Sequence, residues 1–462
     1  MELQYEWRRC SCLEVEKMFK KDNGCVIYSF ETRQRAQYFL IKEGLVIDPV
    51  NKINEIMDVV VEDGRIRAIG KNLEKQFPVA RVIDAKGKWV VPGLMDMHVH
   101  LREPGREDKE TIDTGTQAAA SGGFTSVACM ANTNPVLDEE SKIRYVIQRS
   151  LNCASKVYPI GAITKNLEGE ELAPMGEMIK AGAKAFSDDG RSVEKSNIMR
   201  NALNYSKSFD VPVICHCEDS ALAQKGHMNE GVVSTRLGIR GIPSIAEEMT
   251  VARDLLLAEY TGARVHIAHV STAGSVRLIR DAKSRGVKVT AETAPHYVTL
   301  IDADVGMYDI NKKMNPPLRT VSDREALIAG LADGTIDVIA SDHAPHVPEE
   351  KDVEFDAASF GVLGLETSVG VIITSLVKKG HLSSSDMIMK MSVNPNKILN
   401  TSGGTLSVGA PADITIINPD VEWTVDSKYF FSKSRNTAFE GVTLTGYACC
   451  TILDGQIVFE RN

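Results

Sequence analysis

Residues 96–102 carry the side chains best suited to chemistry, in the order Asp-Met-His-Val-His-Leu-Arg. An apolar run that begins at Trp89 leads into this stretch, which predicts a β-strand whose side chains alternate between two faces. The alternation would place His98, His100 and Arg102 on one face and Met97, Val99 and Leu101 on the other. Two imidazoles on one face suit zinc, whose protein ligands are nitrogen, sulfur and carboxylate oxygen. We therefore expect a metal site at the end of this strand.

Similar side chains follow other apolar runs further along the chain, which has ten histidines. The side chains at the ends of such runs are His216, His269, the pair Asp188 and Asp189, and Asp342 with His343 and His346 close behind. Imidazoles and carboxylates from such distant segments can form one site only if the fold brings these ends together.

Eight apolar segments between residues 92 and 394 alternate with helical stretches, and this alternation predicts the fold. The segments are 94–100, 125–130, 157–162, 183–187, 213–216, 265–270, 287–291 and 338–341. The pattern is typical of an α/β fold, a (β/α)8 TIM barrel with its active site at the carboxyl ends of the strands. One helix is expected to begin at Ser244, where Glu247 is placed to complete a capping box.

Short β-rich runs occupy both ends of the chain, and neither set is large enough to form a core alone. Asp63-Gly64 and Asp454-Gly455 separate such runs and predict hairpin turns. We therefore expect one small composite β-sandwich built from both chain ends. The predicted divisions are an amino-terminal extension at 1–36, sandwich parts at 37–91 and 395–462, and the barrel at 92–394.

The role of residues 1–36 is open. They could form an extension, or Met18 could be the true start. Cys10 and Cys12 could bind a metal, but no second cysteine pair lies nearby to complete a site.

Composition excludes several classes of protein. Hydrophobic residues make up 43% of the 462 residues and charged residues 25%, as in ordinary globular proteins. The net charge of −9 gives no support for nucleic-acid binding. No run of about 18 apolar residues is present, so we expect no membrane span. The nine cysteines show no paired framework, which favours a cytoplasmic location.

Four motifs together resemble the dihydroorotases of the long bacterial (class I) type, within the metal-dependent amidohydrolase superfamily. They are His98-Val-His-Leu-Arg-Glu-Pro-Gly, Asn132-Thr-Asn-Pro, Asn315-Pro-Pro-Leu-Arg and Ser341-Asp-His-Ala-Pro-His. The resemblance covers about residues 38–462. It implies a zinc-dependent, reversible hydrolysis of the cyclic amide of (S)-dihydroorotate to N-carbamoyl-L-aspartate, the third step of de novo pyrimidine biosynthesis.

The resemblance also implies a ligand set for two zinc ions per subunit. His98 and His100 would bind the first ion with Asp342, which would also shuttle the proton; His216 and His269 would bind the second. Many amidohydrolases bridge the ions with a carboxylated lysine, and the matching position here is Ser187. We expect Asp189 to bridge instead, with Asp188 as the alternative and Lys184 as a weaker one.

Substrate would be bound by residues around these ligands. The resemblance assigns this role to His100, Arg102, Asn132, Asn315, His346, Phe360 and Gly361. Arg102 could grip a carboxylate in a planar, bidentate way that lysine does not reproduce. His266 is expected to be structural, and His296 could either support the loop or contact substrate.

Two other functions remain as alternatives. A dihydropyrimidinase or allantoinase would open a related ring. The resemblance implies that enzymes of those families have a lysine at the position of Ser187 in this chain. A non-catalytic scaffold for aspartate transcarbamoylase would have lost metal ligands that this chain retains. The expected partner is a small-molecule substrate, and we expect neither nucleic acid nor membrane. A homodimer and an association with the transcarbamoylase are both possible.

Overall fold

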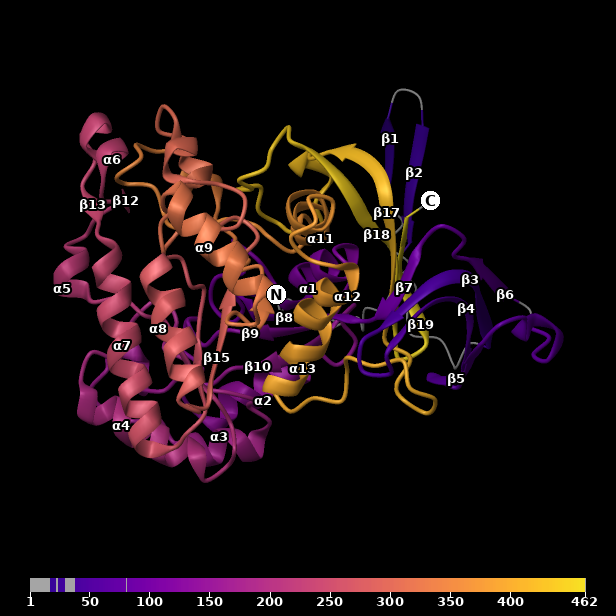
Figure 1. Cartoon of the computed structure of the whole chain (residues 1–462), viewed down its shortest axis with the longest axis horizontal. Helices are drawn as coiled ribbons and strands as arrows, with labels where there is room; N and C mark the ends of the chain where they lie inside the picture. Colours follow the sequence, from indigo (N-terminus) through magenta and orange to yellow (C-terminus); the bar gives the residue numbers. More distant parts are fainter. Residues whose placement is uncertain (1–16, 22–23, 30–37, 80, 462) are drawn as a thin grey trace, which may run out of the picture.

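The computed structural model describes residues 17–21, 24–29, 38–79 and 81–461, so the predictions for Cys10 and Cys12 lie outside it. Figure 1 shows helices gathered in one lobe and a broad sheet forming the other. Strands from both chain ends meet in that sheet.

The sheet has ten strands, in the order β1-β2-β19-β18-β17-β7-β3-β4-β5, with β6 beside β3. Their bounds are β1 (Lys17–Lys21), β2 (Gly24–Ser29), β3 (Phe39–Asp48), β4 (Ile53–Glu62), β5 (Arg65–Gly70), β6 (Arg81–Asp84), β7 (Trp89–Pro92), β17 (Ile414–Thr424), β18 (Thr443–Leu453) and β19 (Gln456–Arg461). The predicted composite of both chain ends is confirmed. The divisions at residues 37, 92 and 395 stay predictions.

Both predicted hairpins are present. Asp63-Gly64 joins β4 to β5, and Asp454-Gly455 joins β18 to β19, each pair antiparallel. Gly64 and Gly455 both have φ of +75°, a conformation that glycine adopts without steric cost.

Parallel strands form the barrel of the second lobe. They are β8 (Leu94–Val99), β9 (Phe124–Cys129), β10 (Lys156–Pro159), β11 (Val213–Cys215), β14 (Val265–Ile267), β15 (Val289–Thr293) and β16 (Val338–Ile339). They pair as β10-β9-β8 and β11-β14-β15-β16. A parallel bridge between Val99 and His343 closes the ring on one side.

The fourth predicted strand, 183–187, differs from the expectation. Phe186 bridges Gly161 on one side and Val213 on the other. The N–H groups of Lys184 and Ser187 also donate to Pro159 O and Gly161 O, but the segment forms no regular strand. The segment still joins the two sets of strands, so the barrel is continuous although the fourth strand is irregular.

Helices surround the barrel strands (Figure 1). Their bounds are α1 (Ile112–Ser121), α2 (Glu140–Arg149), α3 (Met175–Ala181), α4 (Ser196–Lys207), α5 (Ser220–Ala223), α6 (Val232–Leu237), α7 (Ser244–Thr261), α8 (Ala273–Ser284), α9 (Val321–Ala332), α10 (Pro348–Lys351), α11 (Ser368–Ile372), α12 (Ser384–Ile388) and α13 (Asn394–Ile398). Short 3₁₀ turns η1 (Leu73–Lys75), η2 (Lys165–Leu167), η3 (Asp302–Val305), η4 (Ile310–Lys312) and η7 (Ser427–Tyr429), π turns η5 (Ile373–Val377) and η6 (Met389–Val393), and strands β12 (Met228–Asn229) and β13 (Gly241–Ile242) complete the elements.

Helix α7 begins at Ser244 as predicted, but the prediction of a capping box there is wrong. Pro243 occupies the N-cap position and no side chain caps the helix. The buried carboxylate of Glu247 instead accepts hydrogen bonds from the backbone N–H groups of Ser271 (3.1 Å) and Thr272 (3.2 Å). It therefore fixes the turn that follows β14 rather than its own helix.

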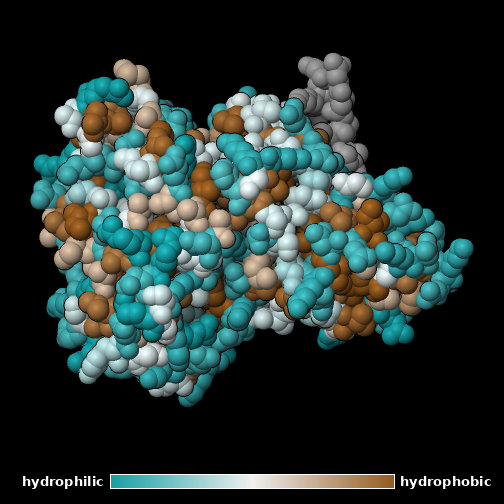
Figure 2. Space-filling model, in the orientation of Figure 1, coloured by the Kyte–Doolittle hydropathy of each residue, from teal (hydrophilic) through white to brown (hydrophobic). Residues whose placement is uncertain are grey.

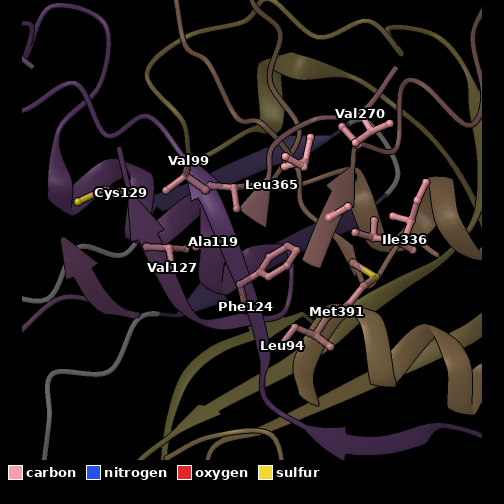
Figure 3. Close-up of a cluster of buried hydrophobic side chains, with 14 of the residues drawn as sticks. Leu94, Val99, Ala119, Phe124, Val127, Cys129, Val270, Ile336, Leu365 and Met391 are labelled. Carbon is pink, nitrogen blue, oxygen red and sulfur yellow. The ribbon is translucent and has the colours of Figure 1, made fainter. Parts of the chain in front are cut away.

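Side chains fill the barrel in two layers, inside and outside the strands. The inner cluster includes Met95, Met97, Ala128, Ile160, Ala185, Ile214 and Val338. The outer one packs β8 and β9 against α1, and Figure 3 shows Leu94, Val99, Ala119, Phe124 and Val127 together there. The prediction that Met97 and Val99 share a face is wrong, because the β8–β9 register shifts between Asp96 and Val99.

The two lobes are joined by polar contacts that are buried or half-buried. Lys156 of β10 reaches Asp413 at 2.7 Å and Asp454 at 2.8 Å, and Thr415 Oγ1 donates to Gly123 O at 2.6 Å. Hydrophilic residues cover much of the face shown in Figure 2, with hydrophobic ones interspersed. Among the described residues, no helix has the length and apolar character needed to cross a membrane.

Candidate metal centre

Four histidines converge at the carboxyl ends of the barrel strands. His98 lies in β8 and His100 just beyond it, while His216 and His269 follow β11 and β14. The ring centroid of His269 lies 5.3 Å from that of His98 and 4.7 Å from that of His216. All four side chains are buried. The predicted convergence of imidazoles from three strand ends is therefore observed.

Asp189 lies among all four imidazoles. Its Oδ1 is 3.4 Å from the Nε2 atoms of His98 and His269 and 3.6 Å from His216 Nδ1, and its Oδ2 is 3.5 Å from His100 Nε2. One carboxylate oxygen thus faces three histidines and the other faces the fourth. This geometry suits a carboxylate that bridges two ions.

The alternative bridging residue, Asp188, points elsewhere. Its Oδ1 accepts hydrogen bonds from the backbone N–H groups of Ile163 (2.8 Å) and Thr164 (3.0 Å), and Thr164 Oγ1 donates to its other oxygen. Ser187 Oγ accepts from the Asp189 N–H at 3.1 Å. These contacts fix the turn and leave Asp189 as the acid that faces the histidines.

Asp342 approaches the histidines from the end of β16. Its Oδ1 is 3.4 Å from His98 Nε2 and 3.3 Å from His100 Nε2. Its side chain is 12% exposed, whereas that of Asp189 is 5% exposed. Asp342 is therefore the metal-centre acid nearer to solvent.

The donor set fits a metal ion. His98, Asp189 and His269 form one group whose ligand atoms lie within 4.8 Å of one another, and His98, His100 and Asp342 form another. His98 Nε2 and Asp189 Oδ1 are buried and have no hydrogen-bond partner among the described residues. Because buried polar atoms are rarely left unpaired, their convergence points to a ligand that both atoms share.

Charge within this cluster alters its titration. Burial alone would lower the pKa of His98, but the carboxylates of Asp189, Asp342 and Glu292 raise it well above its usual value. Burial likewise opposes the charge of Asp189, yet His98, His216 and His269 hold its pKa well below the usual range. Metal ions and protons therefore compete for the same imidazoles.

Another buried carboxylate, that of Glu292, contacts His98 on the side of the ring away from the histidine cluster. The Glu292 carboxylate of β15 accepts from His98 Nδ1 at 2.5 Å and from His266 Nε2 at 3.2 Å. His266 Nδ1 lies 2.8 Å from Thr290 Oγ1. With Nδ1 donating to Glu292, the lone pair of His98 Nε2 faces the cluster. Sequence reasoning missed Glu292, although a carboxylate directly after the predicted apolar segment 287–291 was a usable signal.

Arg102 and His346 lie together beside the metal-centre acids. Arg102 Nη2 is 3.4 Å from His346 Nε2, and Arg102 Nε donates to Pro345 O at 3.1 Å. His346 Nδ1 donates to Glu350 Oε2 at 2.6 Å. Burial and the Arg102 charge lower the pKa of His346 to about 3, so its imidazole is neutral. Arg102 therefore supplies the positive charge at this position, which suits a carboxylate.

Two predicted substrate residues have different surroundings. Asn132 Oδ1 accepts from His100 Nδ1 at 2.9 Å and its Nδ2 donates to Asp189 O at 3.2 Å, so Asn132 orients metal-centre residues. The Asn315 Oδ1 atom is buried without a hydrogen-bond partner among the described residues, and so is His296 Nε2.

The last two predicted substrate residues lie on the loop after β16. Phe360 packs against Ala223, Ile242 and Ala246, and the ammonium of Lys313 lies 4.6 Å from its ring centroid. The N–H of Gly361 donates to Lys313 O at 3.0 Å. The role of each substrate residue stays a prediction.

Solved structures share this architecture. L-hydantoinase (dihydropyrimidinase) from Arthrobacter aurescens superimposes with a TM-score of 0.84 at 26% identity, covering 92% of this chain and 96% of that one. A D-hydantoinase crystal structure, 24% identical, gives a TM-score of 0.80. The barrel, its composite sheet and its histidine cluster thus define an amidohydrolase of the TIM-barrel type.

Sequence relatives identify the family. Dihydroorotase from Pelotomaculum thermopropionicum is 57% identical over 421 residues, which cover 91% of this chain and 98% of that protein. Dihydroorotase from Syntrophotalea carbinolica is 53% identical over 424 residues, with 92% and 99% coverage. A family model described as dihydro-orotase-like matches residues 87–275. The chain belongs to the dihydroorotase family.

Proposed function

We propose that this protein is a zinc-dependent dihydroorotase that interconverts (S)-dihydroorotate and N-carbamoyl-L-aspartate in the third step of de novo pyrimidine synthesis. Relatives more than 50% identical over nearly the whole chain bear the name dihydroorotase. The convergence of four imidazoles and two carboxylates at one barrel mouth is the observation that carries the proposal. The reaction adds water across the ring amide, breaking its C–N bond.

Two zinc ions per subunit fit the donor set. His98 and His100 would hold one ion with Asp342, His216 and His269 would hold the other, and Asp189 would bridge them. The nitrogen and carboxylate ligands match the preferences of zinc. When bound, zinc supplies a nucleophile near neutral pH by lowering the pKa of coordinated water to about 7, and it polarises a carbonyl oxygen.

Asp342 is the acid that handles the proton. Its neighbours His98 and His100 lower its pKa against the opposing effect of burial, so it is ionised and can accept a proton. It lies at the edge of the cluster that is nearer to solvent, where a ring nitrogen could be reached. Asp342 would take the proton of the attacking water and give it to the leaving nitrogen.

Arg102 and His346 would bind the substrate carboxylate. The guanidinium remains charged and offers parallel N–H donors. The unpartnered Asn315 Oδ1 would accept from a ring N–H, and the backbone at Phe360 and Gly361 would border the ring. His100 and Asn132 would complete the pocket from the metal side.

The carboxylate separates this proposal from its rivals. Hydantoinases share the fold at 26% identity or less among the solved structures described above, and the dihydropyrimidine ring carries no carboxylate for Arg102 to grip. Retention of His98, His100, His216, His269 and Asp342 argues against a non-catalytic scaffold.

Metal analysis paired with an assay in both directions tests the proposal. We expect about two zinc ions per chain and turnover of both dihydroorotate and N-carbamoyl-L-aspartate, with dihydrouracil and allantoin as control substrates. Faster turnover of dihydrouracil or allantoin would favour the alternative enzymes. Absence of turnover on every substrate by zinc-loaded protein would favour the scaffold.

A cytoplasmic location belongs to the same proposal. The described free cysteines are all buried, namely Cys129, Cys153, Cys215, Cys217, Cys449 and Cys450. Such unpaired thiols are typical of a reducing compartment. Pairing with a second copy or with aspartate transcarbamoylase stays a prediction, which sedimentation with and without the transcarbamoylase would test.

A further inference from the structure

The loop after β16 has two ends that meet in space. His346 lies near its start, and Gly361 lies at its end. A Cβ atom at Gly361 would lie 3.0 Å from His346 Nε2 and 2.8 Å from the Ala344 Cβ, and the φ of Gly361 is +130°. Only glycine fits at this contact. The position of each end therefore depends on the other.

Asn436, from the carboxyl-terminal part of the chain, ties these two ends together. The side chain is buried, and its Oδ1 accepts from the His346 N–H at 3.1 Å. Its Nδ2 donates to Ala344 O at 3.0 Å and to Gly361 O at 3.1 Å. The Asn436 backbone oxygen also accepts from the Leu363 N–H at 3.0 Å. One amide side chain thus makes three hydrogen bonds across a gap of fifteen residues, from His346 to Gly361.

The same stretch of loop supports the Arg102 guanidinium. Arg102 Nε donates to Pro345 O, and Arg102 Nη2 lies against His346 Nε2. Pro345 stands between the two residues that Asn436 holds, Ala344 and His346. Asn436 therefore fixes the backbone that supports Arg102 and His346, without lying in the metal centre.

We propose that Asn436 is a positioning residue for recognition of the substrate carboxylate. This inference rests on the proposed function, because it assigns the carboxylate to Arg102 and His346. Loss of Asn436 would leave the buried Ala344 carbonyl and the His346 N–H without their partner. The ends of the loop would separate, and the distance between Arg102 and the imidazole would no longer be fixed.

The loop keeps other ties when Asn436 is removed. Lys351 Nζ donates to Ser359 O at 2.9 Å and to Gly361 O at 3.1 Å. Variants at Asn436 should therefore fold with the loop present but less precisely placed. This makes the proposal open to kinetic measurement.

The test compares Asn436→Ala with the unaltered protein. For dihydroorotate we expect KM to rise about tenfold or more, while kcat stays within about threefold. Zinc content should not change. The inhibition constant of dihydrouracil, the same ring without the carboxylate, should stay within about threefold. Asn436→Asp keeps the shape and the acceptor for the His346 N–H but loses both donors, and it should raise KM similarly even if the alanine variant fails to fold.

A matched control is Asn396→Ala. Asn396 of α13 is equally buried, and its Nδ2 donates to Ser392 O of η6 at 2.7 Å. This variant should lose thermal stability with KM unchanged. An unchanged KM in the Asn436 variants, a fall in kcat alone, or an equal rise in KM for Asn396→Ala would overturn the inference. A wild-type protein that turns over neither dihydroorotate nor N-carbamoyl-L-aspartate would instead overturn the proposed function.

Discussion

Asp342 is the acid whose position combines contact with two histidines and partial access to solvent. Asp342→Asn keeps the size and one oxygen ligand but removes the base. We expect the variant to retain metal and to lose kcat by about 10²–10⁴-fold, the usual contribution of general acid–base catalysis. Metal content by mass spectrometry and kcat in both directions check this. Near-normal turnover would refute the proton-transfer role.

Arg102 tests recognition separately from metal binding. Lysine at this position would keep the charge but lose the planar pair of N–H donors. Arg102→Lys should raise KM for dihydroorotate by about tenfold or more and leave zinc content unaltered. Equal KM values in variant and wild type would count against the assignment of the carboxylate to Arg102.

Glu292 is predicted to act on metal affinity through His98. Removing the acceptor of the 2.5 Å contact frees the ring to rotate and to change tautomer. Glu292→Ala should weaken zinc binding by about 10–100-fold, as measured by competition with a chelator. Asp48→Asn is the control, because Asp48 is a buried acid of the sheet that accepts from the Leu406 N–H at 2.7 Å, remote from the barrel mouth. It should lower stability and leave zinc affinity unchanged.

The sequence predicted the residues that stand at strand ends, because parallel strands of a barrel all end at one rim. It could not predict residues whose partners are set by tertiary packing alone. Asn436 has neighbours at positions 344, 346 and 361, and nothing in the polar segment around it indicates that contact. Glu292 was detectable as an acid directly after the predicted apolar segment 287–291, but its pairing with His98 was not.

At the scale of elements, a half-buried acid, Glu366, links the carboxyl-terminal segment to the barrel. The carboxylate of Glu366 accepts from the N–H groups of Phe431 (2.9 Å) and Ser432 (3.2 Å) and from Ser121 Oγ of α1 (2.9 Å). Burial raises the pKa of Glu366 from about 4.5 to about 7. The protonated acid can donate to Ser121 Oγ while still accepting from both N–H groups.

This linkage gives stability a definite pH dependence. Because the folded pKa lies above the unfolded one, the contribution of Glu366 is fully present below pH 4.5 and is lost as pH rises through 7. Glu366→Gln mimics the protonated acid and lacks this loss. Relative to wild type, the variant should therefore gain unfolding free energy between pH 5 and pH 8, by at most about 3 kcal/mol. Its melting temperature relative to wild type should accordingly be higher at pH 8 than at pH 5. A difference that does not vary with pH would contradict the shifted pKa.

Element types followed from hydrophobic periodicity, while local irregularities did not. The register shift in β8 turns Met97 into the barrel interior, and the fourth strand is reduced to an irregular segment around Phe186. Both depend on how neighbouring strands pair, which a single strand's sequence does not encode. Glu247 likewise satisfies N–H groups beyond its own helix because its side chain is buried against the turn after β14.

At the scale of the whole molecule, two chain ends complete one sheet beside the barrel. Both ends have short β-rich runs that are too few to form a core alone, which predicted that they share one core, but the contacts between the lobes were not predictable.

Lys156 is the cation that pairs with Asp413 between the lobes. Replacing Lys156 by methionine would leave the Asp413 carboxylate without this partner, and a buried acid without a partner is destabilising. Lys156→Met should destabilise the protein by about 3 kcal/mol, and Asp413→Asn in the same chain should recover part of the loss in a thermal melt. Additive losses would show that the two groups do not interact.

Metal removal should affect the stability of the whole chain. A ligand that binds only the folded state adds RT ln(1 + [L]/Kd), which is about 4 kcal/mol at a thousandfold excess over Kd. Zinc would also relieve the unpaired His98 Nε2 and Asp189 Oδ1 atoms. We therefore expect chelation to lower the melting temperature and zinc to restore it.

The size of that response should depend on pH. The carboxylates around His98 raise its pKa, so protons compete with zinc as the pH falls. The zinc-induced rise in melting temperature should be larger at pH 8 than at pH 6. His269→Ala removes one ligand and should reduce the zinc-induced rise in melting temperature at both pH values. His343→Ala is the matched control, because His343 lies outside both ligand groups and its Nε2 is 3.4 Å from Glu110. This control variant should retain the rise. A zinc response of equal size in the two variants would mean that the stabilising ion binds somewhere other than the mouth of the barrel.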